Sequence, residues 1–310
     1  MSESLKIKSL TKKYKKSKYF ANDDISFEIL PNKITSIVGH NGAGKTTLLN
    51  QIVGSIIPDS GDIIFKGKSL SKNPNFARKN VSMMPQFHAP LDGVTLKQSI
   101  ESIMYIKGMP KKDIKAEALK IIKELEIEEW QNKSGDKLSG GVGRLTSFAM
   151  ATAFAPKIIL LDEPTNDVDP IRRKLIWKYL RTLANNGHII LIVTHNLLEV
   201  EQYSDRFILL NKGKLVKDSL TGIVENKIKY NTLIVEFINE TNVDEIKLPE
   251  HKKKNYSKEQ RQLTLEINTT NLKDCMQWIT ENIEKQTISN YKLSPISLEN
   301  SYGGYIDESE

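Results

Sequence analysis

The chain has 310 residues, with 45 Lys and Arg against 38 Asp and Glu, and therefore a formal net charge of +7. This length suits one large domain and a smaller one. A single cysteine, Cys275, excludes a disulfide framework and favours a reducing compartment, where we expect it to be a buried apolar side chain. No apolar run approaches the ~20 residues needed to cross a bilayer.

The positive charge is concentrated in lysine clusters at 12–18 and 252–254. Such clusters can contact nucleic acid or an anionic membrane face, but more often they form solvated loops. No nucleic-acid motif accompanies them, so we expect no nucleic-acid partner. The first residues lack the apolar core of a signal peptide, which predicts a cytoplasmic protein.

Residues 39–46 read Gly-His-Asn-Gly-Ala-Gly-Lys-Thr and match the pattern G-x-x-x-x-G-K-[ST] in full. We call them the phosphate loop. A β-branched apolar segment at 33–38 precedes the loop and predicts a buried strand, and residues 47–53 have the spacing of a helix. This arrangement aims backbone N–H groups at phosphate oxygens. We expect Lys45 to reach the β- and γ-phosphates of a nucleotide and the Thr46 hydroxyl to coordinate Mg²⁺.

A second glycine turn lies at 138–142, with the sequence Leu-Ser-Gly-Gly-Val. We call it the serine-glycine turn, and it begins a helix predicted over 139–154. Before it, helices are predicted at 99–109 and 111–125, and Gln86 follows a short predicted strand. A second loop so far from the first indicates a site built from two surfaces, where one molecule's loop closes over a nucleotide held by another.

Two more apolar strands, predicted at 157–161 and 188–193, each end in polar residues. Asp162 and Glu163 follow the first strand, and His195 follows the second. In parallel α/β sheets, ligands bind at this edge. Adjacent carboxylates beside a phosphate are costly unless a cation shares their field, so we expect Asp162 to hold Mg²⁺ and Glu163 to polarise an attacking water. The alternatives are a solvated acidic turn and an ordinary surface or core histidine.

The organisation of the chain changes after about residue 225. Beyond it we predict, in order, strands at 232–237 and 262–267 separated by a polar lysine-rich loop, a helix at 271–284 and a strand at 291–293. The helix carries Leu272, Cys275, Met276, Trp278 and Ile279 on or near one face. These patterns predict an α+β accessory domain at 226–310 after a first domain at 1–225, and nothing in it indicates catalysis.

Together the motifs resemble the ATP-binding subunit of ABC transporters, in the right order and over roughly the first 220 residues. The resemblance implies an α/β P-loop NTPase fold, with a RecA-like sheet, a helical subdomain at about 87–155 and an antiparallel β subdomain. It implies Mg²⁺-dependent ATP hydrolysis, with two ATP molecules bound between two head-to-tail domains, either a homodimer or a heterodimer. It also implies a separate integral membrane permease, which places the chain on the cytoplasmic face of the cell membrane.

The resemblance assigns a role to each motif residue. Ser139 and Gly141 would touch the γ-phosphate of an ATP bound across the dimer. Glu163 would be the general base, and His195 would hold the γ-phosphate and the attacking water. The predicted ATP-binding residues are Tyr14, Gly39, His40, Asn41, Gly42, Ala43, Gly44, Lys45, Thr46, Thr47, Ser139, Gly140 and Gly141; the catalytic residues are Lys45, Gln86, Glu163 and His195; the Mg²⁺ ligands are Thr46, Gln86 and Asp162.

Further roles follow from the same resemblance. Gln86 would sense the metal and relay closure to the permease, beside which residues 87–91 would lie. Asp169 would lie at the dimer contact. Tyr14 would stack on adenine, with Tyr19 as the second candidate. The ending at 295–302 is similar to the tail of the drug-resistance (daunorubicin-type) exporter ATPases, which implies export of a drug, peptide or antibiotic.

Three positions depart from the family pattern. Val142 stands where the family usually has glutamine, and Leu145 replaces the usual arginine, although Arg144 lies next to it. Residues 166–169 read Asn-Asp-Val-Asp, where Ser-Gly-Leu-Asp is commoner. The phosphate-contacting part of the turn is intact, so we expect competent but slow hydrolysis.

Two alternatives remain open from the sequence. The first is a regulatory subunit that closes on ATP and hardly hydrolyses it. The replacement of the usual glutamine by Val142 is consistent with this alternative. The second is a non-transport ABC protein of translation or DNA repair, but those proteins usually carry two nucleotide domains or a long coiled coil. This chain has one phosphate loop and neither feature. The transported substrate and the direction of transport are not encoded in these motifs.

Overall fold

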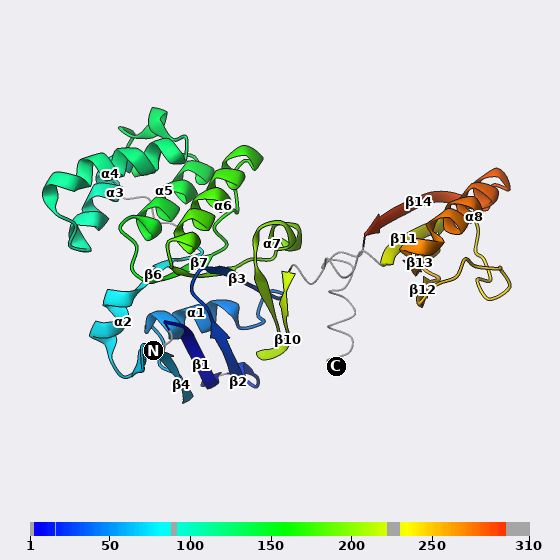
Figure 1. Cartoon of the computed structure of the whole chain (residues 1–310), viewed down its shortest axis with the longest axis horizontal. Helices are drawn as coiled ribbons and strands as arrows, with labels where there is room; N and C mark the ends of the chain where they lie inside the picture. The colour runs from blue at the N-terminus through cyan, green and yellow to red at the C-terminus, as the bar shows by residue number, and fades with distance from the viewer. Residues whose placement is uncertain (1–2, 16, 88–91, 222–229, 296–310) are drawn as a thin grey trace. The chain divides into compact units, whose positions relative to one another are not determined.

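A computed structural model of the chain describes residues 3–15, 17–87, 92–221 and 230–295. Contacts divide the chain into two compact units, Met1–Ser219 and Leu220–Glu310. Figure 1 shows the elements of each unit. All the predicted nucleotide-site residues lie in the first unit.

A six-stranded sheet forms the centre of the first unit, in the order β10–β9–β3–β8–β7–β6, and the strands from β9 to β6 run parallel. The strands are β3 (Lys33–Val38), β6 (Val81–Met84), β7 (Ile158–Asp162), β8 (Ile189–Val193), β9 (Arg206–Asn211) and β10 (Lys214–Leu220). Every residue of β7 and β8 is buried. Their continuous apolar sequences fit this position, because a parallel sheet is covered on both faces.

One face of this sheet is covered by helices, which Figure 1 shows in green. They are α3 (Leu96–Ile106), α4 (Lys111–Glu124), α5 (Gly140–Thr152) and α6 (Pro170–Asn185). Alternate strand residues such as Ile159 and Ile190 pack with them in one apolar core. We call residues 96–152, from α3 to α5, the helical layer; its connections include the short 3₁₀ helices η1 (Glu128–Trp130) and η2 (Gly135–Lys137).

The opposite face packs on α1 (Lys45–Val53) and on an antiparallel sheet of order β2–β1–β4–β5. The remaining elements of the unit are β1 (Leu5–Lys13), β2 (Phe20–Ile29), β4 (Ser60–Phe65), β5 (Lys68–Ser69), α2 (Pro74–Asn80) and α7 (Leu197–Tyr203). Leu160 and Leu191, which alternate with the residues facing the helices, contribute to this second core. The period of two along each strand thus separates the two cores.

The second unit is an antiparallel sheet of order β12–β13–β11–β14 with one long helix. Its elements are β11 (Tyr230–Phe237), β12 (Lys253–Ser257), β13 (Gln262–Asn268), η4 (Thr269–Asn271), α8 (Leu272–Glu284) and β14 (Ile288–Pro295). Alternate residues of β11 and β13, among them Leu233 and Leu265, pack on Cys275 and Ile279 of α8. The single cysteine is buried, and burial raises the pKa of its thiol to about 11.

The predicted α/β P-loop fold, with its helical and antiparallel parts and a small α+β unit, is confirmed. Two details of the second unit were predicted wrongly. The polar, lysine-rich segment contains strand β12, which among the described strands pairs with β13 alone and is largely exposed, so it needs no apolar alternation. Met276 is 39% exposed, whereas Cys275, Trp278 and Ile279 pack in or against the core that α8 shares with the sheet.

Some predictions fall outside the described residues. These are the part of the 87–91 segment beyond Phe87 and the exporter-like tail after Pro295. Within the part of the chain that the structure describes, no helix combines the length and the apolar character required to span a membrane.

Lys107 follows α3 and holds the end of α5. Its ammonium donates to the carbonyl oxygens of Met150, Ala151 and Ala153 at 3.1, 3.2 and 2.9 Å. These carbonyls lie at the helix terminus, where no intrahelical donor is left for them. Burial lowers the pKa of Lys107 to about 8. The helical layer therefore contains a lysine that loses its charge more easily in the folded chain than in the unfolded one.

This pKa shift predicts a pH-dependent stability. Between pH 8 and the ordinary lysine value of 10.5 the unfolded chain binds more protons than the folded chain, so stability rises with pH in that window. From pH 7.5 to 9.5, wild type should gain about 1–2 kcal/mol of unfolding free energy relative to Lys107→Met. Urea unfolding at both pH values measures this gain. Exposed Lys115, replaced by methionine, serves as the control; an equal gain relative to Lys115→Met would contradict the assignment to Lys107.

Candidate nucleotide site

The phosphate loop connects the end of β3 to the beginning of α1, as the motif requires. Gly44 caps α1 with φ +99°, a left-handed conformation that favours glycine. A Cβ atom built on Gly44 would lie 2.0 Å from the carbonyl oxygen of Ala21. Both the backbone conformation and the close approach of β2 therefore require glycine at this position.

Lys45 lies at the first turn of α1 and is buried. Its ammonium donates to the carbonyl oxygens of Gly39 and His40, at 2.7 and 3.0 Å. Burial lowers the pKa of Lys45, while the nearby carboxylates of Asp162 and Glu163 oppose this shift. The lysine is thus folded along its own loop, with its charge close to the two carboxylates.

Asp162 ends β7 and faces the phosphate loop. Its Oδ2 accepts a hydrogen bond of 2.9 Å from the Thr46 hydroxyl, which joins two of the predicted Mg²⁺ ligands. Burial raises the pKa of the Asp162 carboxyl, the Thr46 hydroxyl opposes the shift, and the Glu163 carboxylate adds to it. Hydroxyl and carboxylate oxygens are the ligands that Mg²⁺ prefers, and it is usually bound by one or two carboxylates plus phosphates. The residues present therefore fit a magnesium ion.

Glu163 has a strained backbone and a buried side chain. Its φ is +51°, an uncommon value for a residue with a Cβ, and its N–H donates to the Val193 carbonyl at 2.8 Å. Oε1 lies 2.9 Å from Nδ1 of His195. Oε2 is buried and has no hydrogen-bond partner among the described atoms. Strain of this kind persists at sites where the surrounding structure enforces it, and the unpaired oxygen can accept a proton.

A pocket of about 410 Å³ collects most of these groups. It is lined by Tyr14, Ala21, Asn41, Gly42, Gly44, Lys45, Thr46, Thr47, Gln86, Asp162 and Glu163. The Tyr14 hydroxyl lies 3.3 Å from the Thr47 hydroxyl. Tyr19, the second candidate for adenine, is 79% exposed and is not in this lining. His195, Gly39, His40 and Ala43 lie next to the lining residues rather than among them.

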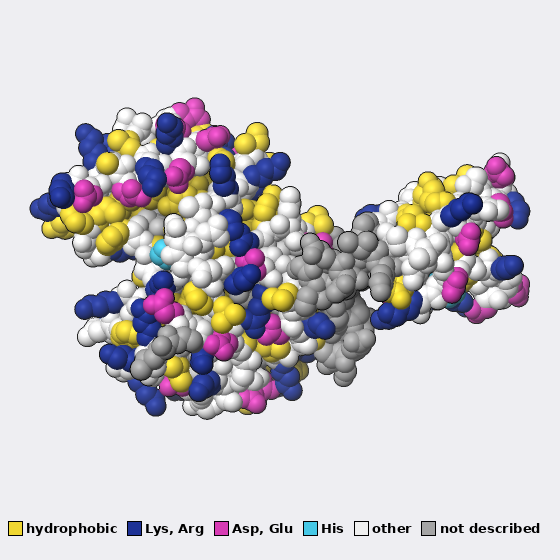
Figure 2. All heavy atoms as spheres, in the orientation of Figure 1, with side chains coloured by type: hydrophobic (Ala, Val, Ile, Leu, Met, Phe, Trp, Pro, Cys, Tyr) yellow, Lys and Arg dark blue, Asp and Glu magenta, His cyan; other side chains and the backbone are white. Residues whose placement is uncertain are grey.

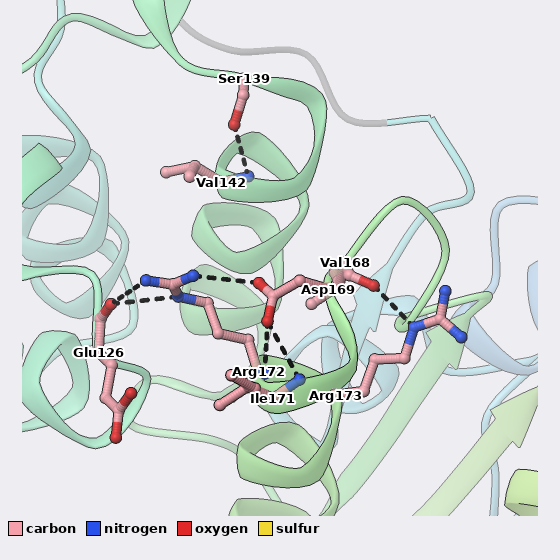
Figure 3. Close-up of polar contacts among 8 residues, drawn as sticks. All are labelled: Glu126, Ser139, Val142, Val168, Asp169, Ile171, Arg172 and Arg173. Atoms are coloured by element: carbon pink, nitrogen blue, oxygen red, sulfur yellow. Dashed lines mark hydrogen bonds and ion pairs between the residues drawn. The ribbon is translucent and has the colours of Figure 1, made fainter.

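The serine-glycine turn lies apart from this lining. Ser139 caps α5, where its hydroxyl accepts a hydrogen bond of 3.4 Å from the Val142 N–H (Figure 3). A Cβ atom on Gly141 would lie 2.6 Å from the Asp167 carbonyl oxygen, while Gly140 has open space around it within the described residues. Val142 is buried in the apolar core of the helical layer.

Asp169 caps the N-terminus of α6. Its carboxylate accepts hydrogen bonds from the N–H groups of Ile171 and Arg172 at 3.1 and 3.0 Å (Figure 3). Burial acts to raise the pKa of this carboxyl, but the contacts with Arg172 and Ile171 outweigh it and lower the pKa. We call residues 166–169 the aspartate loop. It touches the serine-glycine turn at Gly141 through Asp167.

The motifs did not reveal several residues that shape the site. Arg144, buried in α5, donates to the Gln86 carbonyl oxygen at 2.5 Å, whereas its neighbour Leu145 lies in the core. Buried Asn22 donates to the Gly44 carbonyl oxygen at 3.2 Å and so supports the phosphate loop. Ala21 lines the pocket. No motif marks Asn22 or Ala21; Arg144 was visible only as an unusual neighbour of Leu145.

The parallel sheet, the phosphate loop and the carboxylates at the strand ends define a P-loop NTPase fold. Residues 22–166 match the family model described as "ABC transporter". ATP-binding cassette sub-family A member 2 of Rattus norvegicus is 34% identical over 67% of this chain. Sub-family A member 10 of Homo sapiens is 35% identical over 69% of it. The chain spans only 8% and 14% of the lengths of these relatives.

Solved structures agree with this match. A dimeric structure of MJ0796, described as a bacterial ABC transporter cassette, has a TM-score of 0.65 and 26% identity, and the match covers 70% of this chain and 98% of that one. The same figures hold for a dimer of MJ0796 bound to ADP and Pi in a post-hydrolysis state. Residues 22–166 therefore form an ABC ATPase domain of the kind found in ABC transporters.

Proposed function

We propose that the chain binds and hydrolyses ATP between two ATPase subunits and thereby drives a separate membrane permease. The observation that carries this proposal is the division of the site. The pocket holds the phosphate loop with Asp162 and Glu163, while Ser139 and Gly141 lie outside its lining. A second copy would supply its own serine-glycine turn, as the dimeric cassette structures suggest.

The residues divide the chemistry between binding and proton transfer. The phosphate loop and Lys45 would bind the phosphates, and Tyr14 would stack on the adenine. Mg²⁺, held by Thr46 and Asp162, would neutralise phosphate charge. Phosphoryl transfer depends mainly on positioning and on stabilisation of charge. Glu163 would take the proton of the attacking water on its unpaired Oε2, while His195 holds Oε1 and with it the orientation of the carboxylate.

The pocket would receive further groups on closure. Gln86 lines it, and its carbonyl is held by Arg144 of α5, so a movement of the helical layer would reach the metal site through this bond. Ser139 and Gly141 of a second copy would contact the γ-phosphate. The N-terminus of α5, which Ser139 caps, would add favourable electrostatics at that phosphate.

The permease would dock on the helical layer. Tyr105 and Ile106 at the end of α3 are 56% and 75% exposed, and Phe87 after β6 is 83% exposed. Figure 2 shows hydrophobic side chains gathered over α3 and α4. Exposed apolar patches of this kind often mark protein interfaces. This docking would place the chain at the cytoplasmic face of a membrane.

Export of a drug, peptide or antibiotic is proposed as the transport function. One support is the resemblance of residues 295–302 to the tail of drug-resistance exporters, which rests on the sequence alone. Two Mus musculus relatives bear the names "ABC-type organic anion transporter ABCA8B" and "Retinal-specific phospholipid-transporting ATPase ABCA4". Those names concern the relatives themselves, and they support an organic cargo for this chain.

We call the proposed site, in which one copy holds the nucleotide and a second copy supplies its serine-glycine turn, the composite site. Such a site predicts that ATP turnover depends on protein concentration. Because each site needs a second copy, the rate per molecule should rise with concentration and level off once dimers dominate. A steady-state phosphate-release assay over a hundredfold dilution series, roughly spanning the dimer equilibrium, measures this. A rate per molecule that stays constant over a series in which light scattering shows dissociation would contradict the composite site.

A further inference from the structure

Arg172, in the first turn of α6, connects three parts of the first unit. Nη1 lies 3.1 Å from the Asp169 carboxylate, while Nε and Nη2 both donate to the Glu126 carbonyl oxygen, at 3.2 and 3.1 Å (Figure 3). The guanidinium also lies over the Trp130 ring, 5.0 Å from its centroid. One side chain therefore joins the aspartate loop to the helical layer.

The Glu126 turn is a fixed point of the helical layer. It follows directly after α4, and Glu126 has a φ of +53° with its N–H bonded to the Lys123 carbonyl at 3.1 Å. Trp130, in η1, packs against the apolar core of the layer. A guanidinium held by both groups cannot follow α6 away from the helical layer without losing these contacts.

The aspartate loop touches the helical layer at a second point. The backbone of Asp167 lies so close to Gly141 that a Cβ atom there would be 2.6 Å from the Asp167 oxygen. The loop is therefore tied to the layer beside the serine-glycine turn and again beside Glu126. The first of these connections runs through Gly141, which a dimer would bring to the nucleotide of the other copy.

The adjacent Arg173 connects the same loop to α7. Its Nε donates to the Val168 carbonyl at 2.7 Å (Figure 3). Its Nη1 lies 3.4 Å from the Glu199 carboxylate. Glu199 belongs to α7, which begins two residues after His195. Neighbouring arginines thus connect one loop to the helical layer and to the segment that carries His195.

We propose that Arg172 is a positioning residue that makes the aspartate loop move with the helical layer, and so sets ATP turnover at the composite site. This inference rests on the proposed function of the dimer. Arg172 is not catalytic, because in the described part of the chain it lies outside the pocket lining and its contacts are with Glu126, Trp130 and Asp169. It would affect turnover by fixing the position of the aspartate loop relative to Gly141.

The geometry requires an arginine rather than a positive charge alone. The planar guanidinium donates to Asp169 and to the Glu126 carbonyl at once and stacks on an aromatic ring, which an ammonium cannot reproduce. Arg172→Lys keeps the charge beside Asp169 but cannot keep both N–H contacts with Glu126. This variant therefore separates the two connections, and Arg172→Ala removes both.

The test combines hydrogen exchange without ATP and steady-state kinetics, with Lys174→Ala as control, since Lys174 is exposed on the same helix. Arg172→Ala and Arg172→Lys should both speed amide exchange in peptides covering 125–131 and 164–171 by about tenfold. Both should lower kcat by about 5- to 20-fold while the Kd for ATP stays within about twofold. Lys174→Ala should change neither quantity.

Three results would overturn the proposal: unchanged exchange in Arg172→Ala, unchanged kcat in Arg172→Ala, or wild-type behaviour of Arg172→Lys. A Kd for ATP that rises as much as kcat falls would equally overturn it, because such a change indicates general damage to the fold. A wild-type rate that does not depend on protein concentration contradicts the proposed dimer instead. In that case the exchange rates, measured without nucleotide, still decide whether Arg172 holds the loop.

Discussion

Glu163→Gln should lower ATP turnover by about 10²- to 10⁴-fold while ATP binding stays close to that of wild type. The carboxylate has one oxygen bonded to His195 and one buried oxygen without a partner. The glutamine amide has nearly the same shape, so it can keep the contact with His195. It cannot accept the proton of an attacking water, because an amide is not a base at neutral pH.

Single-turnover phosphate release and equilibrium ATP binding measure the two parts of this prediction. If dimers form on ATP, Glu163→Gln should also hold them longer, because hydrolysis no longer releases them. Glu163→Asp is the matched variant: it keeps a base but displaces it by one methylene, and should retain an intermediate rate. Turnover by Glu163→Gln above about a tenth of the wild-type rate would exclude Glu163 as the base.

The sequence predicts the parts of the site that depend on local backbone geometry. The phosphate loop is one such part, because strand, glycine loop and helix are continuous in the chain and their geometry follows from the motif. Asp162, Glu163 and His195 are predicted as neighbours because parallel strands present their carboxyl ends at one edge. In the structure Asp162 contacts Thr46, and Glu163 contacts His195.

Contacts between distant segments could not be predicted in the same way. Arg144 reaches Gln86 across 58 residues, and Arg172 reaches Glu126 across 46. Both contacts end on a backbone carbonyl, so no side-chain pattern in the sequence points to the acceptor. The strain at Glu163 is equally invisible, because its φ of +51° is imposed by the surrounding structure.

Strand β12 shows a second reason for failure. It is an edge strand whose exposed residues are mostly polar, so neither apolar alternation nor a continuous apolar run marks it. Its partner β13 alternates buried and half-buried residues and was predicted from that pattern. Sequence periodicity reports burial, and it therefore misses elements that are held mainly by backbone pairing.

Gly141→Ala should destabilise the folded chain by about 1–3 kcal/mol and lower turnover by at least about tenfold. The added Cβ would lie 2.6 Å from the Asp167 carbonyl oxygen, so either α5 or the aspartate loop must move. The matched change Gly140→Ala places its Cβ in open space within the described residues. It should stabilise the start of α5 slightly, because alanine costs less backbone entropy in a helix than glycine.

This pair of variants separates two reasons why residue 141 is glycine: contact with a phosphate and close packing on Asp167. The family resemblance assigns Gly141 to the γ-phosphate of a partner's ATP, a role that exists only in the closed dimer. The contact with Asp167 is present in a single chain, so it predicts a loss of stability without nucleotide, measurable by urea unfolding of the dilute protein. If Gly141→Ala unfolds at the same urea concentration as Gly140→Ala and only its turnover falls, the phosphate contact alone explains the glycine. A fall in both shows that the serine-glycine turn and the aspartate loop are packed against each other before any dimer forms.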